Sequence, residues 1–199
     1  MGDFAFYGEE IMRLRAAERF VLARIERYRE SRREETGEDP VEHCKSRVKT
    51  GESMRAKLRA RGYPEDCASA LKNVTDAVGV RVVCDFIDDV YAVADFIRAQ
   101  ADWRVVKEKD YIANPKPNGY RSYHMVVRLL GGACGGLFVE IQLRTIAADC
   151  WASLEHQMKY KHSIRHPKLM EGELKRFADE IASTDYSLLT IRELMNEEF

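Results

Sequence analysis

Residues 137–144, LFVEIQLR, read as a β-strand whose two faces differ in chemistry. Successive side chains of a strand point to opposite faces of the sheet. One face is wholly apolar and belongs in a core, and it consists of Leu137, Val139, Ile141 and Leu143. The other face places polar groups within a hydrophobic strand, and it consists of Phe138, Glu140, Gln142 and Arg144. A buried glutamate costs free energy unless it is paired, solvated or bound to a metal. Glu140 therefore lies either on an exposed sheet face or in a functional cleft.

The segments on both sides of this strand alternate between strand and helix patterns. Runs rich in β-branched residues predict further strands at 78–86, 103–109 and 123–130. Apolar residues at helical spacing predict helices at 9–30, 53–61, 88–100, from 145 onward and over most of 171–197. The glycine-rich stretch GGACGG at 131–136 predicts a hairpin turn between the last two strands. This order predicts an α/β (α+β) domain with a mixed sheet flanked by helices.

Composition argues against several classes of protein. The 199-residue chain is 45% hydrophobic and 33% charged, which is typical of a globular protein. Its net charge of −1 creates no overall field that would attract nucleic acid or a membrane surface. No stretch approaches the ~20 apolar residues of a membrane span, and the first residues lack the pattern of a secretory leader. The five cysteines are scattered without a CxxC pair, so we expect a reducing, cytoplasmic location.

Positive charge is concentrated in residues 45–61, KSRVKTGESMRAKLRAR. Seven basic residues stand there against a single acid, a local excess of six positive charges. Ser53, a possible N-cap, shares one face of the predicted helix with Lys57 and Arg61, and Lys49 comes just before that helix. A helix N-terminus beside serine and lysine is a ready anion site. The alternative is a solvated basic face, but such a face normally intersperses acids, so the pattern favours an anion site.

The stretch KDYIANPKPNGYRSYH at 109–124 combines turn formers with basic and aromatic side chains. Its two prolines stiffen the loop and its Asn-Gly pair turns the chain. A stiff loop holds side chains in place at a low entropy cost. The candidate ligand-binding residues are Lys109, Lys116, Asn118, Tyr120 and His124. The tyrosine offers a ring for stacking, the lysines offer charge to phosphate groups, and the histidine offers a hydrogen-bond donor.

Two carboxylates are candidate metal ligands. Asp76 comes just before the strand at 78–86, and Glu140 lies in the middle of the strand at 137–144. If these strands are neighbours, the two carboxylates meet. Carboxylate oxygens, with phosphate completing the shell, are the ligands that Mg²⁺ prefers. Asp76 alone is equally well explained as a turn residue, and the chain lacks the glycine-rich P-loop pattern. The residues indicate phosphoryl transfer between nucleotides, a description that also fits many kinases and transferases.

Five stretches, in order along the chain, resemble the synthetase domain of RelA/SpoT-type alarmone synthetases. They are RVKTGESMRAKL (47–58), TDAVGVRVVC (75–84), KDYIANPKPNGYRSYH (109–124), VEIQLRT (139–145) and WASLEHQMKYK (151–161). The chain looks like a stand-alone small member of that family. The resemblance implies a nucleotidyltransferase-like fold and a GTP pyrophosphokinase. Such an enzyme transfers the β,γ-pyrophosphate of ATP to the 3′-hydroxyl of GDP or GTP and releases AMP.

The resemblance also implies roles for individual residues. Arg47 is expected to stack on adenine. The expected ATP-phosphate ligands are Lys49, Ser53 and Lys57, with Arg61 as an addition. The expected GDP or GTP contacts are Lys109, Lys116, Asn118, Tyr120 and His124, with Gln142 and Arg144 beside them. Asp76 and Glu140 are expected to bind Mg²⁺, and Glu140 also to accept the proton of the attacking hydroxyl.

By the same resemblance, residues 40–162 form the synthetase domain, with helical extensions at 1–39 and 163–199. Small members of the family are often homotetramers, so we expect an oligomer. Two alternatives stay open. The first keeps the fold and changes the acceptor, as in toxic relatives that pyrophosphorylate the tRNA 3′ end or make adenosine alarmones. The basic stretch at 45–61 would also suit tRNA. The second is a non-catalytic sensor that binds nucleotide or RNA.

Overall fold

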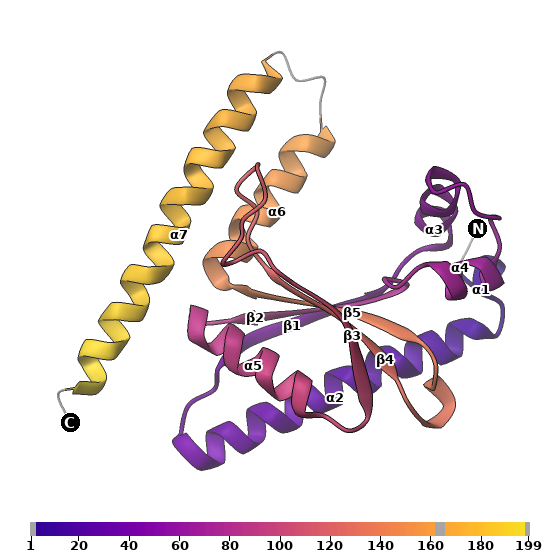
Figure 1. Ribbon diagram of the computed structural model, residues 1–199, viewed down its shortest axis with the longest axis horizontal. Coiled ribbons are helices and arrows are strands. Elements are labelled where there is room, and N and C mark those ends of the chain that lie inside the picture. The colour runs from indigo at the N-terminus through magenta and orange to yellow at the C-terminus, as the bar shows by residue number, and fades with distance from the viewer. Residues whose placement is uncertain (1–2, 162–165, 198–199) are drawn as a thin grey trace.

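Five strands form one mixed sheet in the computed structural model, which describes residues 3–161 and 166–197 (Figure 1). The strands are β1 (Val41–Val48), β2 (Val78–Cys84), β3 (Trp103–Asp110), β4 (Tyr123–Leu129) and β5 (Phe138–Thr145). They lie in the order β1-β2-β5-β4-β3. The central pair β2 and β5 is parallel, and the other neighbours are antiparallel. A parallel pair needs a long crossover, and here the chain passes through a helix and two strands between β2 and β5.

Helices pack around this sheet. They are α1 (Phe4–Tyr7), α2 (Glu10–Thr36), α3 (Gly51–Ala60), α4 (Cys67–Asn73), α5 (Ile87–Ala99), α6 (Ile146–Lys161) and α7 (Pro167–Glu197), with a 3₁₀ helix, η1 (Gly132–Cys134), between β4 and β5. Figure 1 shows α2 and α5 on the same side of the sheet, whereas α6 and α7 project beyond its end. Within the described residues, no helix combines the length and the apolar character needed to cross a membrane.

The apolar face of the sheet is covered by α2 and α5. Their core residues include Leu14, Val21, Ile25, Val90, Val93 and Ile97, which join Val139, Ile141 and Leu143 of β5 in one buried cluster. Tyr28 of α2 stacks on Phe96 of α5, with ring centroids 4.5 Å apart. Burying each large apolar side chain contributes roughly 1.5–3 kcal/mol. This cluster therefore fixes which face of β5 is left for polar chemistry.

The helix α3 begins where β1 ends. Thr50 is its N-cap, because the Thr50 hydroxyl accepts a hydrogen bond from the Ser53 backbone N–H at 3.3 Å. Met54 and Leu58 are fully buried. With this apolar side packed inward, Lys57 on the same helix reaches the Asp76 carboxylate, which comes just before β2.

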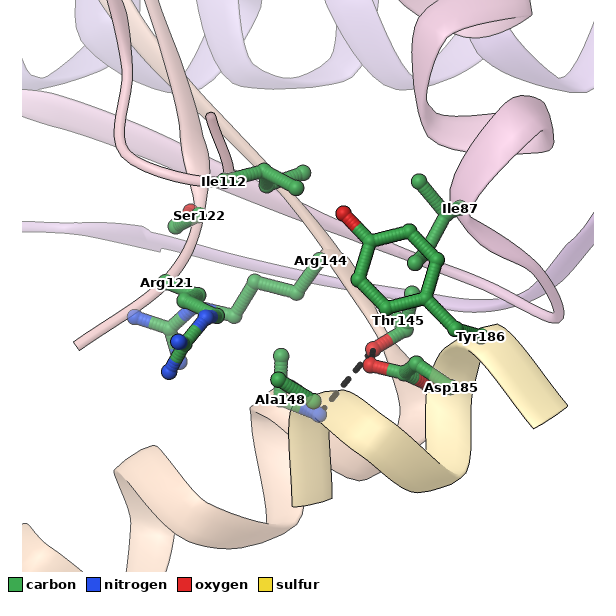
Figure 2. A pocket seen from close by; sticks show the side chains of 10 residues that line it. Ile87, Ile112, Arg121, Ser122, Arg144, Thr145, Ala148, Asp185 and Tyr186 are labelled. Atoms are coloured by element: carbon green, nitrogen blue, oxygen red, sulfur yellow. Dashed lines mark hydrogen bonds between the residues drawn. The ribbon is translucent and has the colours of Figure 1, made fainter. Parts of the chain in front are cut away.

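At the other end of the sheet, α6 and α7 pack together. Trp151 of α6 is buried and donates its indole N–H to the Leu174 carbonyl of α7 at 2.8 Å. Figure 2 shows the joint between α7 and the sheet, where the Thr145 hydroxyl donates to Asp185 at 2.7 Å and accepts from the Ala148 backbone N–H at 3.1 Å. The cavity at this joint is only about 20 Å³, so it belongs to the packing of α7 and is too small for a nucleotide.

The predicted α/β fold with a mixed sheet is confirmed, and each of the four predicted strands agrees with an observed strand to within two residues. The strand β1 was not predicted from the sequence, because this edge strand buries only Val41 and Val48 and is otherwise polar, so it lacks a β-branched run. The short helices α1 and α4 were not predicted either.

Three local predictions are corrected. The first long helix runs past residue 30 to Thr36 and ends at Gly37, whose φ of 76° is in the left-handed region. Thr50 caps α3 in place of Ser53. The stretch GGACGG contains η1, so it forms a longer connection than a tight turn. The predicted domain boundary between residues 162 and 163 lies outside the described residues.

Gly119 allows the β3–β4 loop to dock on α7. Its φ is 87°, and a Cβ at this position would lie 2.5 Å from the Cβ of Ala178. We predict that Gly119→Ala lowers the free energy of unfolding by roughly 1–3 kcal/mol, because it adds backbone strain and a clash. Urea denaturation measures this loss.

Ala178→Gly provides the matched test of the clash. On its own it costs about 1 kcal/mol as a glycine within a helix. In the Gly119→Ala background it should cost less, because it removes the atom that clashes. Strictly additive costs would show that the loop does not dock on α7 at this point.

Candidate active site

One face of the sheet carries two rows of mainly polar residues that cross its strands. In the order β1, β2, β5, β4, β3, the first row is Arg47, Gly79, Glu140, Val126 and Lys107. The second row is Lys45, Arg81, Gln142, His124 and Lys109. Glu140 therefore lies at the centre of the face with cations toward both edges. No atom lies within 4 Å of the position that a Cβ of Gly79 would take, so the space beside Glu140 stays open.

Asp76 is the second carboxylate at this centre. Its Oδ2 lies 2.6 Å from Nζ of Lys57 and 3.4 Å from Nζ of Lys49. Its Oδ1 is buried and has no hydrogen-bond partner in the described part of the chain. A buried oxygen without a partner costs free energy. That oxygen is therefore a candidate ligand for a cation that binds between Asp76 and Glu140.

Glu140 is held in its charged form. The Gln142 amide donates a hydrogen bond to Oε2 of Glu140 at 2.9 Å, and Nδ1 of His124 lies 3.7 Å from Oε1. Burial opposes ionisation of the Glu140 carboxyl, but the contacts with His124 and Gln142 and the charge of Lys57 outweigh it. Together they lower the pKa of Glu140 from 4.5 to about 2. The carboxylate is thus anionic at neutral pH.

Two cavities open beside these carboxylates, and both share Asp76 and Glu140. Cavity A, of about 240 Å³, is lined by Lys45, Ser46, Arg47, Asp76, Gly79, Val80, Arg81, Glu140 and Gln142. Cavity B, of about 260 Å³, is lined by Lys57, Arg61, Thr75, Asp76, Lys107, Lys109, Tyr111, Lys116, His124, Val126 and Glu140. Cations outnumber carboxylates in each cavity, so a polyanion that spans both would pass directly over the two acids.

The β3–β4 loop places aromatic rings next to cavity B. The Tyr120 hydroxyl lies 2.8 Å from Nε2 of His124 and accepts a hydrogen bond from Arg144 at 2.8 Å. The Lys116 ammonium lies 4.5 Å from the ring centroid of Tyr120 and 4.7 Å from that of Tyr111. These distances are within the range of cation–π attraction. The loop therefore presents an oriented ring together with positive charge, which suits a nucleotide.

Most of the residues predicted from sequence meet here. Those that line a cavity are Arg47, Lys57, Arg61, Asp76, Lys109, Lys116, His124, Glu140 and Gln142. Lys49, Tyr120 and Arg144 contact lining residues directly. Ser53 and Asn118 lie outside the walls of both cavities. The Ser53 hydroxyl accepts a hydrogen bond from Thr50, and the Asn118 amide donates to Glu155 at 3.2 Å.

The site residues predicted from the sequence did not include Arg81, Lys107 and Tyr111, whose charged or aromatic side chains line the cavities. Arg81 interrupts an apolar strand in the same way as Glu140, and that signal was available in the sequence. Lys107 and Tyr111 carry no such signal, because a lysine on an edge strand and a tyrosine in a loop are ordinary surface residues. Only the register of β3 against β4 brings Lys107 next to Val126 and the site.

A family model described as "Region found in RelA / SpoT proteins" matches residues 46–165. The chain belongs to the RelA/SpoT family. This RelA/SpoT chain is 42% identical over 159 residues to the GTP pyrophosphokinase YwaC of Bacillus subtilis (strain 168), a match that covers 78% of this chain and 76% of YwaC. It is 35% identical over 161 residues to the GTP pyrophosphokinase YjbM of the same organism, covering 79% and 75% of the two chains.

Solved structures of the RelA/SpoT family share the fold. The crystal structure of the small alarmone synthetase 1 from Bacillus subtilis, bound to its product pppGpp, matches with a TM-score of 0.83 and 31% identity. That match covers 93% of this chain and 95% of the other. The small alarmone synthetase 2 from Bacillus subtilis matches with a TM-score of 0.81 and 36% identity, covering 92% and 97%.

The low pKa of Glu140 has a consequence for stability. A carboxyl whose pKa falls on folding stabilises the protein above its unfolded value, and that contribution is lost as the pH falls toward the folded value. We predict that Glu140→Gln is less stable than the wild type at pH 7, and that the gap narrows as the pH falls below about 4.5. Chemical denaturation at a series of pH values measures the gap. A gap that widens on acidification would contradict the assigned pKa direction.

Proposed function

We propose that this chain is a (p)ppGpp synthetase, a GTP pyrophosphokinase. It transfers the β,γ-pyrophosphate of ATP to the 3′-hydroxyl of GDP or GTP and releases AMP. The observation that carries this proposal is the pair of carboxylates shared by two cation-lined cavities. Transfer of a charged group between two nucleotides needs positioning and neutralisation of charge on both sides of the reacting centre. The likeness to YwaC and YjbM, and to a synthetase structure that holds pppGpp, supports the same activity.

ATP enters with its base in cavity A. Arg47 and Arg81 both line that cavity, and planar guanidinium groups stack well on aromatic bases. The triphosphate then runs past Asp76 toward Lys49 and Lys57, which already contact that carboxylate. Arg61 on the wall of cavity B and the Ser53 hydroxyl at the start of α3 serve as further phosphate contacts.

GDP or GTP binds on the side of the β3–β4 loop. The Tyr120 ring stacks on guanine, and the hydrogen bonds of its hydroxyl to His124 and Arg144 fix its orientation. Lys109 and Lys116 face cavity B, where they neutralise the acceptor phosphates. Asn118 and Gln142 complete the surroundings of the guanosine. In this proposed pose, the ribose of the acceptor nucleotide faces Glu140.

Asp76 and Glu140 are suited to hold one Mg²⁺ ion. Mg²⁺ usually takes one or two carboxylates and fills its shell with substrate phosphates and water. The unpartnered Oδ1 of Asp76 and the ionised Glu140 provide such donors. Over residues 3–161 and 166–197, no group of three or more His, Cys, Asp or Glu forms a metal cluster, so phosphate oxygens would complete the set. When bound, the ion would neutralise charge on the transferred group and polarise its phosphoryl oxygens.

A pKa of about 2 limits Glu140 as a base. The best catalytic pKa lies near the working pH, so Glu140 is a poor acceptor for the proton of a free hydroxyl. We infer that it orients the 3′-hydroxyl and accepts the proton only as the new bond to phosphorus forms, when the hydroxyl becomes acidic. The contacts with His124 and Gln142, together with the charge of Lys57, lower the pKa of Glu140 and keep it ionised until that moment.

Other acceptors are less well supported. Transfer to the tRNA 3′ end or to adenosine nucleotides would use the same pyrophosphate donor, ATP. A non-catalytic sensor would bind nucleotide or RNA without any transfer. The relatives named above are GTP pyrophosphokinases, which favours guanosine acceptors. An acceptor assay separates these possibilities.

We predict that the purified chain, given ATP, Mg²⁺ and GDP or GTP, releases AMP and forms ppGpp or pppGpp. Glu140→Gln should lower kcat/KM at least ~10²-fold, because it removes the proton acceptor and a metal ligand. Chelation of the divalent cation should stop turnover. Ion-exchange chromatography of the nucleotides measures all three results.

Glu65→Gln is the matched control for this assay. Glu65 pairs with Arg59 on the surface at 2.7 Å and lines neither cavity, so its replacement should leave the rate unchanged. Pyrophosphate transfer to tRNA or ATP but not to guanosine nucleotides would contradict the acceptor assignment. Near-normal synthesis by Glu140→Gln would contradict the role of Glu140.

We infer that the chain self-associates, as a homotetramer, through the exposed side of α7. The apolar side chains exposed near the end of this helix are Leu188, Ile191, Leu194 and Met195. The other side of α7 packs inward through Leu174, Ala178 and Ala182. A contiguous exposed apolar stripe marks an interaction site.

We also propose a cytoplasmic location for the chain, in keeping with its scattered cysteines.

We predict that Ile191→Glu lowers the molar mass of the particle, because it places a charge in the middle of this stripe. Light scattering after size exclusion measures the mass. Glu193→Gln, an exposed polar position on the same helix, is the control and should leave the mass unchanged. A monomeric wild type would refute the self-association.

A further inference from the structure

Asp149 is a buried carboxylate that none of the roles above uses. It lies in the first turn of α6 and is only 6% exposed. Its Oδ1 lies 2.9 Å from a terminal nitrogen of Arg144 and 2.9 Å from a terminal nitrogen of Arg81. Its Oδ2 lies 3.9 Å from the Lys45 ammonium. One anion from a helix therefore holds two arginines that belong to neighbouring strands.

Arg144 connects Asp149 with the acceptor side of the site, where GDP or GTP is proposed to bind. It is 5% exposed, and Figure 2 shows its side chain extending away from the α7 joint at Thr145 and Asp185. Its second terminal nitrogen donates to the Tyr120 hydroxyl at 2.8 Å and to the Gln142 amide oxygen at 3.1 Å. Gln142 in turn donates to Glu140, so one chain of hydrogen bonds joins the stacking ring to the central carboxylate.

Arg81 connects Asp149 with the donor side of the site, where ATP is proposed to bind. It lines cavity A and pairs with Lys45 across β1 and β2. Burial lowers the pKa of the Arg81 guanidinium, the charge of Arg144 lowers it further, and Asp149 raises it. The Nε atoms of Arg81 and Arg144 are buried without hydrogen-bond partners in the described residues. Two partly satisfied guanidinium groups repel each other here, and Asp149 is the anion that holds them together.

We propose that Asp149 is a positioning residue that couples the two nucleotide sites, orienting Arg81 toward the donor and Arg144 toward the Tyr120 platform and Glu140. This inference rests on the proposed function. Asp149 itself lines neither cavity. Replacing Asp149 should therefore lower kcat/KM for both substrates at once. Loss of a residue that touches one nucleotide should lower kcat/KM mainly for that nucleotide.

The first test compares Asp149→Asn with the wild type. Asparagine keeps the shape and one acceptor oxygen but removes the charge that balances two arginines. We expect kcat/KM to fall about 10–100-fold, both with ATP varied and with the guanosine nucleotide varied, which is the typical cost of losing a partner that orients the ligands of a metal site such as Glu140. Initial rates over a matrix of the two substrates give both values.

Asp39→Asn is the matched control. Asp39 also holds two arginines, Arg29 and Arg33, each at 2.7 Å, but it lies between α2 and β1 and outside both cavities. Its replacement should lower stability and leave both kinetic constants unchanged. If Asp149→Asn behaves in the same way, losing stability alone, then Asp149 is merely structural and the proposal is wrong.

A double-mutant cycle tests the route through Arg144. Tyr120→Phe removes only the hydroxyl, with its contacts to Arg144 and His124, and should cost roughly 10-fold in kcat/KM for the guanosine nucleotide, the order of one or two net hydrogen bonds. In the Asp149→Asn background the same change should cost clearly less, because Arg144 is no longer aimed at that hydroxyl. Equal costs in the two backgrounds would overturn the route.

Two results keep this test separate from the proposed function. If the wild type makes no alarmone, or Glu140→Gln is fully active, the proposed function has failed. If the wild type is active and Glu140→Gln is not, only the Asp149 kinetics decide the present inference. Should Asp149→Asn not fold, Asp149→Glu keeps the charge but displaces it by one methylene. That variant must still raise KM for both nucleotides, and unchanged KM values would overturn the proposal.

Discussion

The parallel pairing of β2 with β5 is the constraint on which the site depends. In this register Gly79 lies opposite Glu140, and Asp76 stands just ahead of β2 at the same end of the pair. The same pairing buries Val80 and Ile141 on the other face. A slip of one residue would turn Glu140 into the core and an apolar side chain into the site. Core packing and active-site geometry are therefore fixed by one set of contacts, and the core cannot accept a different register without losing the site.

Charge explains how a chain with a net charge of −1 offers a site for polyanions. Asp76 and Glu140 are costly to bury, and Lys49, Lys57 and His124 offset that cost in the free protein. Further cations line the cavities without carboxylate partners there, so the local field is positive although the surface as a whole is balanced. Phosphate groups of the nucleotides would pair with these cations, which have no carboxylate partners within the cavities.

Segments far along the chain order the β3–β4 loop. Gly119 packs against Ala178 of α7, and Arg121 donates to the Ala178 carbonyl at 3.2 Å and pairs with Asp179 at 3.1 Å. From the other side, Arg144 of β5 holds Tyr120. The prolines stiffen this loop locally, but its position over cavity B is set by contacts with α7 and β5. The C-terminal helix is thus tied to the geometry of the acceptor side.

The sequence by itself determined the period-two alternation of β5, the β-branched runs of β2 and β4, the excess of cations at 45–61 and the aromatic, basic loop, because each is a local pattern. From these came the fold class, four strands and most of the candidate site. Tertiary structure alone decided that β1 is a strand, since a polar edge carries little hydrophobic signal. It also decided that Lys107 and Tyr111 line the cavities, and that Asp149 joins two arginines. These facts depend on strand order, register and helix docking, which bring together residues distant in sequence and leave no periodic trace in the chain.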